Sequence, residues 1–444
     1  MLIDSLTKFN DIVPDLLACQ KPVVDTETTG LNIWGVGGKE KSKIIGIATA
    51  TDYENYYFPF RHATGQNLPI ELIQKFFKPY LSNHNRIFAG FNYKFDMHML
   101  ANDGIPYARN IEDVMLAVHL LNENEKNFKL KELCDRYGIG TGSLQESILE
   151  DKVYDKCKEL GLPCSRSPKA EYNTKNMMYV LSPADVEPYA CEDVILTKKL
   201  LNICIPALEH WGIYDLWKEV NYYSYINNHI ESRGFEIDVE LMNQYAKEAD
   251  IHYKEAQEIL NKLAGYNINA NSSPQVCALL GVDSSSAEML NLLIEAGGEN
   301  AEIAKAVVLC RGWKSVVSRY YVPYSQALDK NNVLRTNLNL MGTISGRLSC
   351  SNPNLQAVAR QTEVFKVKDI FKARKGFKLV SADYAQAEMR LGTWYAQEEN
   401  MLKTINSGED FHTSTANMLN VPRDVAKRIN FGVIYGIGAG ALSR

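Results

Sequence analysis

Short apolar runs alternate with longer helical stretches over the first 205 residues. Segments rich in β-branched and aromatic residues occur at 21–27 (KPVVDTE), 42–60 (SKIIGIATATDYENYYFPF) and 85–93 (NRIFAGFNY). Such segments are typical of strands, and the stretches between them favour helices. The pattern therefore predicts one α/β domain over residues 1–205.

The pattern changes after residue 205. Residues 206–300 carry long helical periodicity, as in 238–265 (DVELMNQYAKEADIHYKEAQEILNKLAG), with almost no strand signal, which predicts an extended helical element. Strand-like runs return at 333–342 (VLRTNLNLMG) and 377–383 (FKLVSAD), and helical stretches follow to the end. We therefore place domain boundaries near 205 and 335, with a third part at 336–444.

Composition narrows the class of protein. The 444 residues are 45% hydrophobic, but no run approaches the roughly 18 uncharged apolar residues of a membrane span. The N-terminus has early acids where a signal peptide has a basic region, so we expect a cytoplasmic protein without a membrane partner. Nine cysteines lie singly with no C-x-x-C pair, which argues against a zinc site or a disulfide framework.

Charge is unevenly distributed along the chain. The net charge is −5, yet residues 301–444 hold 20 Lys and Arg against 11 Asp and Glu, which leaves −14 for residues 1–300. A phosphate backbone responds to local charge within a Debye length of about 8–10 Å. The balance of the C-terminal part suits a polyanionic partner.

Two carboxylates end the first strand-like run. Asp25 and Glu27 in VVDTETTGL are two residues apart, so both side chains point to one face of a strand. Two acids on one face are costly unless a cation lies between them. The alternative is a strand that ends in a solvated acidic turn.

Four further residues bear on that choice. Asp96 lies in the aromatic-rich segment GFNYKFDMHML, and Tyr189 precedes Asp193 by one helical turn in VEPYACEDVILTKKL. Taken singly, Asp96 could be a helix N-cap and Tyr189 a half-buried aromatic. Asp113, in NIEDVMLAVHLL, suits a structural cap at least as well as a site.

The C-terminal part holds a second group of candidate residues. Asp383 stands where the apolar run of KLVSADYAQAEMRLG meets an amphipathic segment, as a helix cap or a metal ligand. In RDVAKRINFGVIYGIGAG, a spacing of four would place Arg423, Lys427, Phe431 and Tyr435 in one slowly drifting stripe on a helix. Two cations followed by two aromatics suit a triphosphate and a base, although a solvated basic helix end is the simpler alternative. Gly436 and the glycines after it predict a break in that helix.

The order of the N-terminal motifs resembles the 3′→5′ exonuclease family with four acidic ligands and a tyrosine. Its pattern D-x-E, N-x-x-x-F/Y-D, Y-x-x-x-D is met at Asp25 and Glu27, at Asn92 to Asp96 with one residue fewer, and at Tyr189 to Asp193. The resemblance implies a ribonuclease H-like mixed sheet with flanking helices. It also implies two Mg²⁺ or Mn²⁺ ions, held by the four acids, for hydrolysis of single-stranded DNA 3′ ends.

The later segments resemble the polymerase module of the family A DNA polymerases. The segments are GTISGRLSCSNPNLQAVAR, DYAQAEMR (motif A), GEDFHTSTA, RDVAKRINFGVIYG (motif B) and the thumb-like NANSSPQ. The resemblance implies a partial right-hand polymerase domain with a helical thumb at 206–335, and an α+β palm with the start of the fingers at 336–444. Ala385, Ala387 and Ala357 replace residues more usual in the family.

Residue roles follow from the same resemblance. Asp383 and the Tyr384 carbonyl would hold two catalytic Mg²⁺ or Mn²⁺ ions. Glu388 would exclude a ribose 2′-hydroxyl while hydrogen-bonded to Tyr435. The residues assigned to nucleotide binding are Tyr384, Gln386, Glu388, His412, Arg423, Lys427, Phe431 and Tyr435. Those assigned to DNA binding are Arg347, Gln356, Asn271 and Ser273.

The family's motif C, H-D-E, which supplies the second catalytic acid, does not follow motif B in this sequence. We therefore expect the N-terminal portion of a proofreading replicative or repair DNA polymerase, closer to bacteriophage members. The alternatives are a stand-alone exonuclease whose polymerase remnant grips DNA, and a non-catalytic DNA-binding subunit. Expected partners are primer-template DNA, dNTPs, and a C-terminal polymerase fragment or processivity factor.

Overall fold

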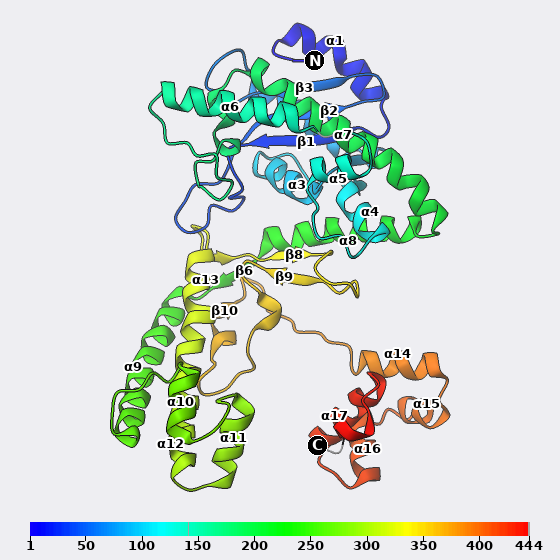
Figure 1. The fold of residues 1–444 in the computed structure, drawn as a ribbon. Coiled ribbons are helices and arrows are strands. Elements are labelled where there is room, and N and C mark those ends of the chain that lie inside the picture. The colour runs from blue at the N-terminus through cyan, green and yellow to red at the C-terminus, as the bar shows by residue number, and fades with distance from the viewer. Residues whose placement is uncertain (141, 443–444) are drawn as a thin grey trace. The chain divides into compact units, whose positions relative to one another are not determined.

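A five-stranded mixed sheet forms the centre of residues 1–208 in the computed structural model, which describes residues 1–140 and 142–442 (Figure 1). The strand order is β3-β2-β1-β4-β5, with β1 antiparallel to β2 and parallel to β4. The strands are β1 Val23–Thr28, β2 Ile44–Ala50, β3 Asn55–Pro59, β4 Phe88–Gly90 and β5 Ile111–Asp113. The strands predicted within 21–27, 42–60 and 85–93 are thus confirmed.

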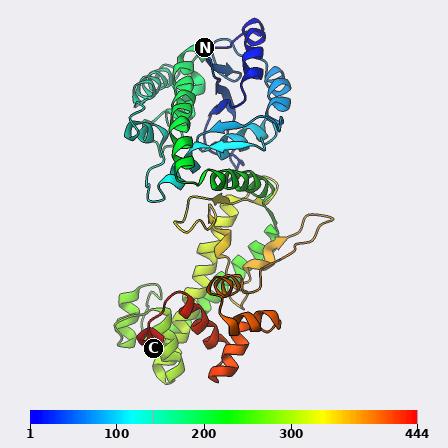
Figure 2. The same ribbon diagram turned by 90° about the vertical axis from the view of Figure 1, so that its right-hand side faces the viewer.

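Helices cover both faces of this sheet (Figures 1 and 2). Val23 packs in one core and its neighbour Val24 in the other, as period-two alternation requires of a strand buried on both faces. The Val24 core involves α1 Leu6–Ala18, α2 Ile70–Leu81 and α3 Tyr93–Asn102. The Val23 core involves α4 Val114–Leu121, α5 Leu130–Arg136, α6 Ser143–Glu159, the 3-10 helix η1 Lys175–Val180 and α7 Pro183–His210. The expected α/β architecture is confirmed.

A long helical element follows, as the periodicity of 206–300 predicts. Its helices are α8 Tyr214–Arg233, α9 Val239–Ala264, α10 Ser273–Leu280, α11 Ala287–Ala296, α12 Glu299–Val316, the π-helical turn η2 Val317–Tyr321 and α13 Val322–Ala327. Helices α9 and α12 lie side by side and bury Leu260 and Val307 in a shared core. A small sheet then pairs β10 Phe371–Lys372 and β7 Val333–Leu334 with β6 Phe235–Ile237. The hairpin β8 Asn337–Asn339 and β9 Ser349–Ser351 precedes the short 3-10 turns η3 Leu355–Ala357 and η4 Val367–Ile370.

The chain divides into two compact units, Met1–Lys375 and Gly376–Arg444, each described by itself. The second unit is helical, with α14 Ala387–Ala396, α15 Glu399–Asn406, α16 Phe411–Leu419, α17 Arg423–Ile434 and α18 Ala439–Leu442. Gly436 at φ 74° follows the end of α17, so the predicted glycine break is observed. The sequence-based boundary at 205 falls inside α7, and the one at 335 falls just after β7.

One strand prediction is wrong. Residues 377–383, expected as a palm strand that ends at Asp383, form no strand and are exposed to solvent. A strand needs a neighbour to pair its backbone N–H and C=O groups, and no strand in the described part of the chain pairs with this segment. Asp383 is not a helix cap either, because α14 begins at Ala387 and Gln386 is its N-cap residue.

No helix among the described residues is long and apolar enough to cross a membrane. All nine cysteines are free, as expected from their scattered positions.

Glu231, near the end of α8, connects the α/β domain of residues 1–208 to the β8–β9 hairpin by hydrogen bonds. Its carboxylate accepts hydrogen bonds from Lys94 Nζ (2.9 Å) and from the backbone N–H of Leu338 (2.5 Å). His98 Nε2 lies 2.8 Å from the other carboxylate oxygen. Burial would raise the pKa of Glu231, but the bonds to His98 and Lys94 outweigh it and lower the pKa. One buried carboxylate therefore connects α3, α8 and β8.

We expect Glu231→Ala to destabilise the protein by about 3–5 kcal/mol, because the half-buried Lys94 ammonium loses this carboxylate partner and the buried backbone N–H of Leu338 loses its side-chain acceptor. Urea unfolding monitored by circular dichroism measures the loss. Glu219→Ala, an exposed change on the same helix, is the matched control and should stay within about 0.5 kcal/mol of the parent. Equal stability of the two variants would contradict a structural role for the Glu231 bonds.

Candidate functional site

Three carboxylates from β1 and the adjacent helix α7 lie close together. Asp25 and Glu27 are two residues apart on β1, and Asp193 lies on α7. One carboxylate oxygen of each lies within 4.8 Å of the others. Period-two geometry explains why Asp25 and Glu27 share a face. Tyr189 precedes Asp193 by one turn of α7 and so lies on the same side of the helix.

Asp96 lies against the same strand, although it is not one of those three. Its Oδ1 accepts hydrogen bonds from the backbone N–H (3.0 Å) and the hydroxyl of Thr26, the residue between Asp25 and Glu27. Gly90 permits this approach, because a Cβ there would stand 2.6 Å from the ring of Tyr93 at the start of α3. The structure therefore brings all four predicted acids to one strand and groups three of them tightly.

Asp113 has a structural role in this arrangement. Its carboxylate caps α4 by accepting from Met115 N–H and also accepts from the N–H groups of Asn92 and Tyr93, each at 3.0 Å. Asn92 adopts a left-handed backbone conformation, φ 54°. Asp113 thus aligns the first turn of α3, which carries Asp96. The prediction that Asp113 is a helix cap is confirmed.

The electrostatics of the cluster favour a bound cation. Burial, followed by repulsion from Asp193, raises the pKa of Glu27 to about 8. Burial raises the pKa of Asp96 to about 7, and burial together with Asp96 and Glu27 raises the pKa of Asp25 well above its usual range. Glu27 Oε1 is buried with no hydrogen-bond partner among the described residues. These pKa shifts mean that the charged forms of the carboxylates lack compensation, which a divalent cation bound to hard oxygen donors would supply.

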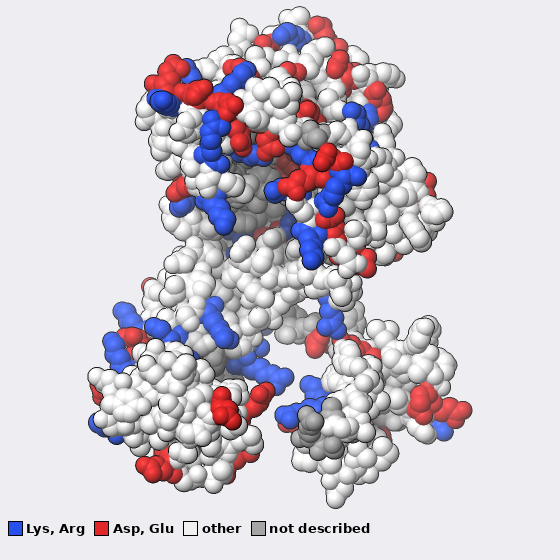
Figure 3. Space-filling model, in the orientation of Figure 1, with Lys and Arg blue, Asp and Glu red and all other residues white. Residues whose placement is uncertain are grey.

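Sequence reasoning missed two lysines at this site. Lys131 Nζ lies 3.3 Å from Asp193 Oδ1 and 4.1 Å from the centroid of the Tyr189 ring. Lys175 pairs with Glu146, which also lies 3.4 Å from Lys131. Figure 3 shows that Lys and Arg are interleaved with Asp and Glu over the surface of the α/β domain. No motif marks these lysines, since only the packing of α5, α6 and η1 beside α7 brings them to the site.

In the second unit, α16, α17 and the C-cap residue of α17 carry five of the eight predicted nucleotide-binding residues. The rings of His412 and Phe431 lie 5.6 Å apart, and Phe431 stacks with Tyr435 at 6.5 Å. Arg423 pairs with Asp410 at 2.9 Å, which lowers the pKa of that acid. Lys427 lies on α17 between Arg423 and Phe431, as the four-residue spacing predicts.

Of the motif A residues, Gln386 and Glu388 hydrogen-bond to residues around α16 and α17. Tyr435 donates a hydrogen bond to Glu388 Oε2 (2.8 Å), as expected from the family resemblance, and Gln386 donates to Asp410 (2.6 Å). Asp383 and Tyr384 are exposed. Within residues 1–140 and 142–442, Asp383 belongs to no group of three metal-ligating side chains.

The predicted DNA-binding residues are distributed over the first unit. Arg347 lies in the β8–β9 connection and Gln356 in η3, where its amide donates to Leu348 O. Ser273 is the first residue of α10, and Asn271 lies two residues before it. All four are exposed.

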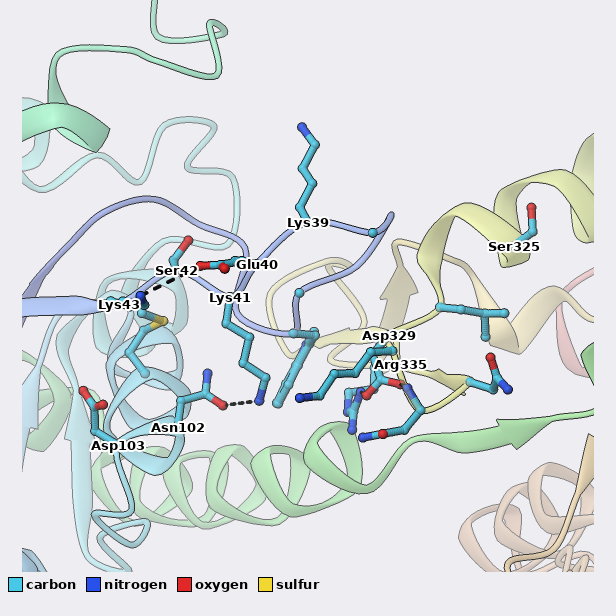
Figure 4. A pocket seen from close by; sticks show the side chains of 18 of the residues that line it. Lys39, Glu40, Lys41, Ser42, Lys43, Asn102, Asp103, Ser325, Asp329 and Arg335 are labelled. Atoms are coloured by element: carbon cyan, nitrogen blue, oxygen red, sulfur yellow. Dashed lines mark hydrogen bonds and ion pairs between the residues drawn. The ribbon is translucent and has the colours of Figure 1, made fainter. Parts of the chain in front are cut away.

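A separate cleft of about 1100 Å³ opens between the 34–43 loop and the 325–335 segment (Figure 4). Its cations are largely paired within the protein: Lys41 donates to Asn102 at 2.8 Å and Arg335 pairs with Asp329 at 2.6 Å. This cleft lacks the unsatisfied charge of the carboxylate cluster, so we take the cluster as the candidate site.

An α/β domain with clustered carboxylates thus precedes a helix-rich domain, as in the class of enzymes that join a 3′→5′ exonuclease domain to a polymerase domain. Residues 1–208 match the 3′-5′ exonuclease family and residues 239–444 match DNA polymerase family A. The chain belongs to the family A DNA polymerases that carry a 3′-5′ exonuclease domain.

Several bacterial relatives align along the chain. DNA polymerase I of Borreliella burgdorferi is 27% identical over 98% of this chain and 47% of its own length, and that of Pseudomonas aeruginosa is 25% identical over 95% and 46%. The thermostable DNA polymerase I of Thermus aquaticus is 31% identical over 49% of this chain and 29% of its own. The chain thus spans about half the length of the first two. These relatives are bacterial proteins, so they do not support the expectation that the chain is closer to bacteriophage members of the family.

A solved structure shares the fold. The POL domain of Pol1 from M. smegmatis, in complex with DNA primer-template and dNTP, aligns with a TM-score of 0.73 at 17% identity, over 98% of this chain and 71% of that one. The expected combination of an exonuclease domain and a polymerase domain is confirmed.

The raised pKa of Glu27 makes the metal-free protein sensitive to pH. Between the usual value of 4.5 and the folded value of about 8, the folded state keeps a proton that the unfolded chain has lost, so stability falls as pH rises. We expect Glu27→Gln to be more stable than the parent by at least about 1 kcal/mol at pH near 8 in EDTA, and about equal at pH near 5. Chemical denaturation at both pH values measures this.

Glu71→Gln, an exposed change on α2, is the control and should show no such pH dependence. A constant difference between Glu27→Gln and the parent across this range would contradict the pKa assignment.

Proposed function

We propose that residues 1–208 hydrolyse single-stranded DNA from its 3′ end with Mg²⁺ or Mn²⁺. The observation that carries this proposal is the convergence of Asp25, Glu27 and Asp193 within 4.8 Å, with a buried Glu27 oxygen that lacks a hydrogen-bond partner among the described residues. The match to the 3′-5′ exonuclease family supports the same reaction.

The proposed roles of the side chains follow from their positions. Asp25, Glu27 and Asp193, with Asp96 beside them, would hold two ions. When bound, such ions supply a nucleophilic water at neutral pH and neutralise charge on the leaving 3′ oxygen. Tyr189, one turn of α7 before Asp193, would orient the attacking water. Asp96, fixed by Thr26, would keep β1 and α3 in register around the ions.

We further propose that the rest of the chain belongs to the polymerase active site of the complete protein. Residues 206–335 would form the start of the polymerase domain with its thumb, and residues 336–444 part of the palm and fingers. The paired Glu388 and Tyr435, and the His412, Phe431 and Tyr435 rings, support a dNTP site. The solved relative is a complex with primer-template DNA and dNTP, and the same partners are proposed here, in the cytoplasm.

A stand-alone exonuclease is the second candidate. It is favoured by the contrast between the assembled Asp25–Glu27–Asp193 group and the exposed Asp383, which belongs to no group of three metal-ligating side chains among the described residues. The two candidates differ in whether this chain takes part in template-directed synthesis.

We expect Asp25→Ala combined with Glu27→Ala to reduce Mg²⁺-dependent hydrolysis of a 3′-labelled single-stranded oligonucleotide by at least about 10³-fold, because two of the clustered ligands are lost. Release of the labelled nucleotide measures the rate. Asp11→Ala with Glu71→Ala removes the same charges from exposed helix positions and should leave the rate unchanged. Undiminished hydrolysis in the first variant would refute the metal assignment.

Primer extension tests the polymerase proposal. We expect the chain to extend a primer when a polypeptide carrying the H-D-E segment is added, and Asp383→Asn to abolish this extension without altering 3′ hydrolysis, because Asp383 lies outside the nuclease domain. Incorporation of labelled dNTP measures extension. No extension in the presence of the added polypeptide would favour the stand-alone exonuclease.

A further inference from the structure

A line of alternating charges runs from the carboxylate cluster toward the surface. Lys131 Nζ lies between Asp193 Oδ1 (3.3 Å) and Glu146 Oε2 (3.4 Å), and Glu146 in turn pairs with Lys175. The Lys131 side chain is only 12% exposed, whereas that of Lys175 is 47% exposed. A nearly buried ammonium is costly unless carboxylates compensate it, and here it has two.

The same ammonium contacts the second functional group on α7. It stands 4.1 Å from the centre of the Tyr189 ring, within the range of a cation–π interaction. Tyr189 and Asp193 face the same side of the helix, one turn apart. Lys131 therefore contacts both side chains that α7 contributes to the site.

We propose that Lys131 is a positioning residue that acts as a built-in counter-ion: its ammonium holds Asp193 and Tyr189 in place before a divalent cation binds, and competes with that cation for Asp193 Oδ1. This inference rests on the proposed function, in which Asp193 is a metal ligand. Two cations that share one carboxylate oxygen in a partly buried site repel each other strongly. Glu146 offers the displaced ammonium a second carboxylate within reach.

The proposal predicts that loss of Lys131 strengthens cation binding, whereas a purely structural role predicts weaker or unchanged binding. We expect Lys131→Met to bind Mn²⁺ about tenfold more tightly than the parent, measured at fixed pH by electron paramagnetic resonance of free Mn²⁺. Glu146→Gln should weaken Mn²⁺ binding severalfold. Of the two carboxylates that contact Lys131, Asp193 then remains, so the ammonium competes more strongly with the cation for it. Lys129→Met, an exposed change two residues away, should stay within about twofold.

Thermal unfolding provides a second measurement that does not depend on activity. In EDTA, Lys131→Met should unfold at a lower temperature than the parent, because Asp193 has lost its counter-ion. Added Mn²⁺ should then raise the unfolding temperature of this variant more than that of the parent. Lys131→Gln, which keeps a polar group in the site, serves in place of Lys131→Met if the latter does not fold.

The outcomes separate this inference from the proposed function. A parent protein that binds no Mn²⁺, or binding that survives Asp25→Ala with Glu27→Ala, would overturn the metal site itself. Mn²⁺ binding by the parent with equal or weaker binding by Lys131→Met would overturn the counter-ion role alone. Tighter binding by Lys131→Met, with Lys129→Met unchanged, supports it.

Discussion

Mutual repulsion among the buried and half-buried carboxylates at β1 is the constraint around which the first domain is organised. Asp25, Glu27 and Asp193 lie within 4.8 Å of one another, and burial and repulsion raise the pKa of Glu27 to about 8. Such a cluster lasts in a folded protein only if rigid neighbours hold it and cations compensate it. The central sheet supplies the rigidity, because β1 is hydrogen-bonded on both sides, to β2 and to β4.

The supporting contacts form a layer behind the cluster. Asp113 aligns the first turn of α3, Thr26 fixes Asp96, and Lys131 compensates Asp193. Glu231 then ties α3 to α8 and to the β8 hairpin, whose connection carries Arg347. The domain that matches the 3′-5′ exonuclease family and the part that matches DNA polymerase family A are therefore joined by hydrogen bonds as well as by the chain itself.

Sequence patterns predict the local parts of this arrangement well. The strand alternation around Asp25 and Glu27, the one-turn spacing of Tyr189 and Asp193, and the helix of motif B are all observed. The palm strand expected at 377–383 is absent from the described structure, because an apolar run becomes a strand only beside a partner strand. Its β-like pattern, from Phe377 to Asp383, says nothing about whether such a partner exists.

By itself the sequence determined the family, the order of the domains and the residue types of the site, because these depend on motifs and on spacing along one strand or one helix. Only the tertiary structure decided which acids converge, that Asp113 is a helix cap, and that Lys131 and Glu146 reach the cluster. Those facts depend on contacts between segments distant in the chain, such as α5, α6 and α7. Packing creates these contacts, and no local periodicity records them.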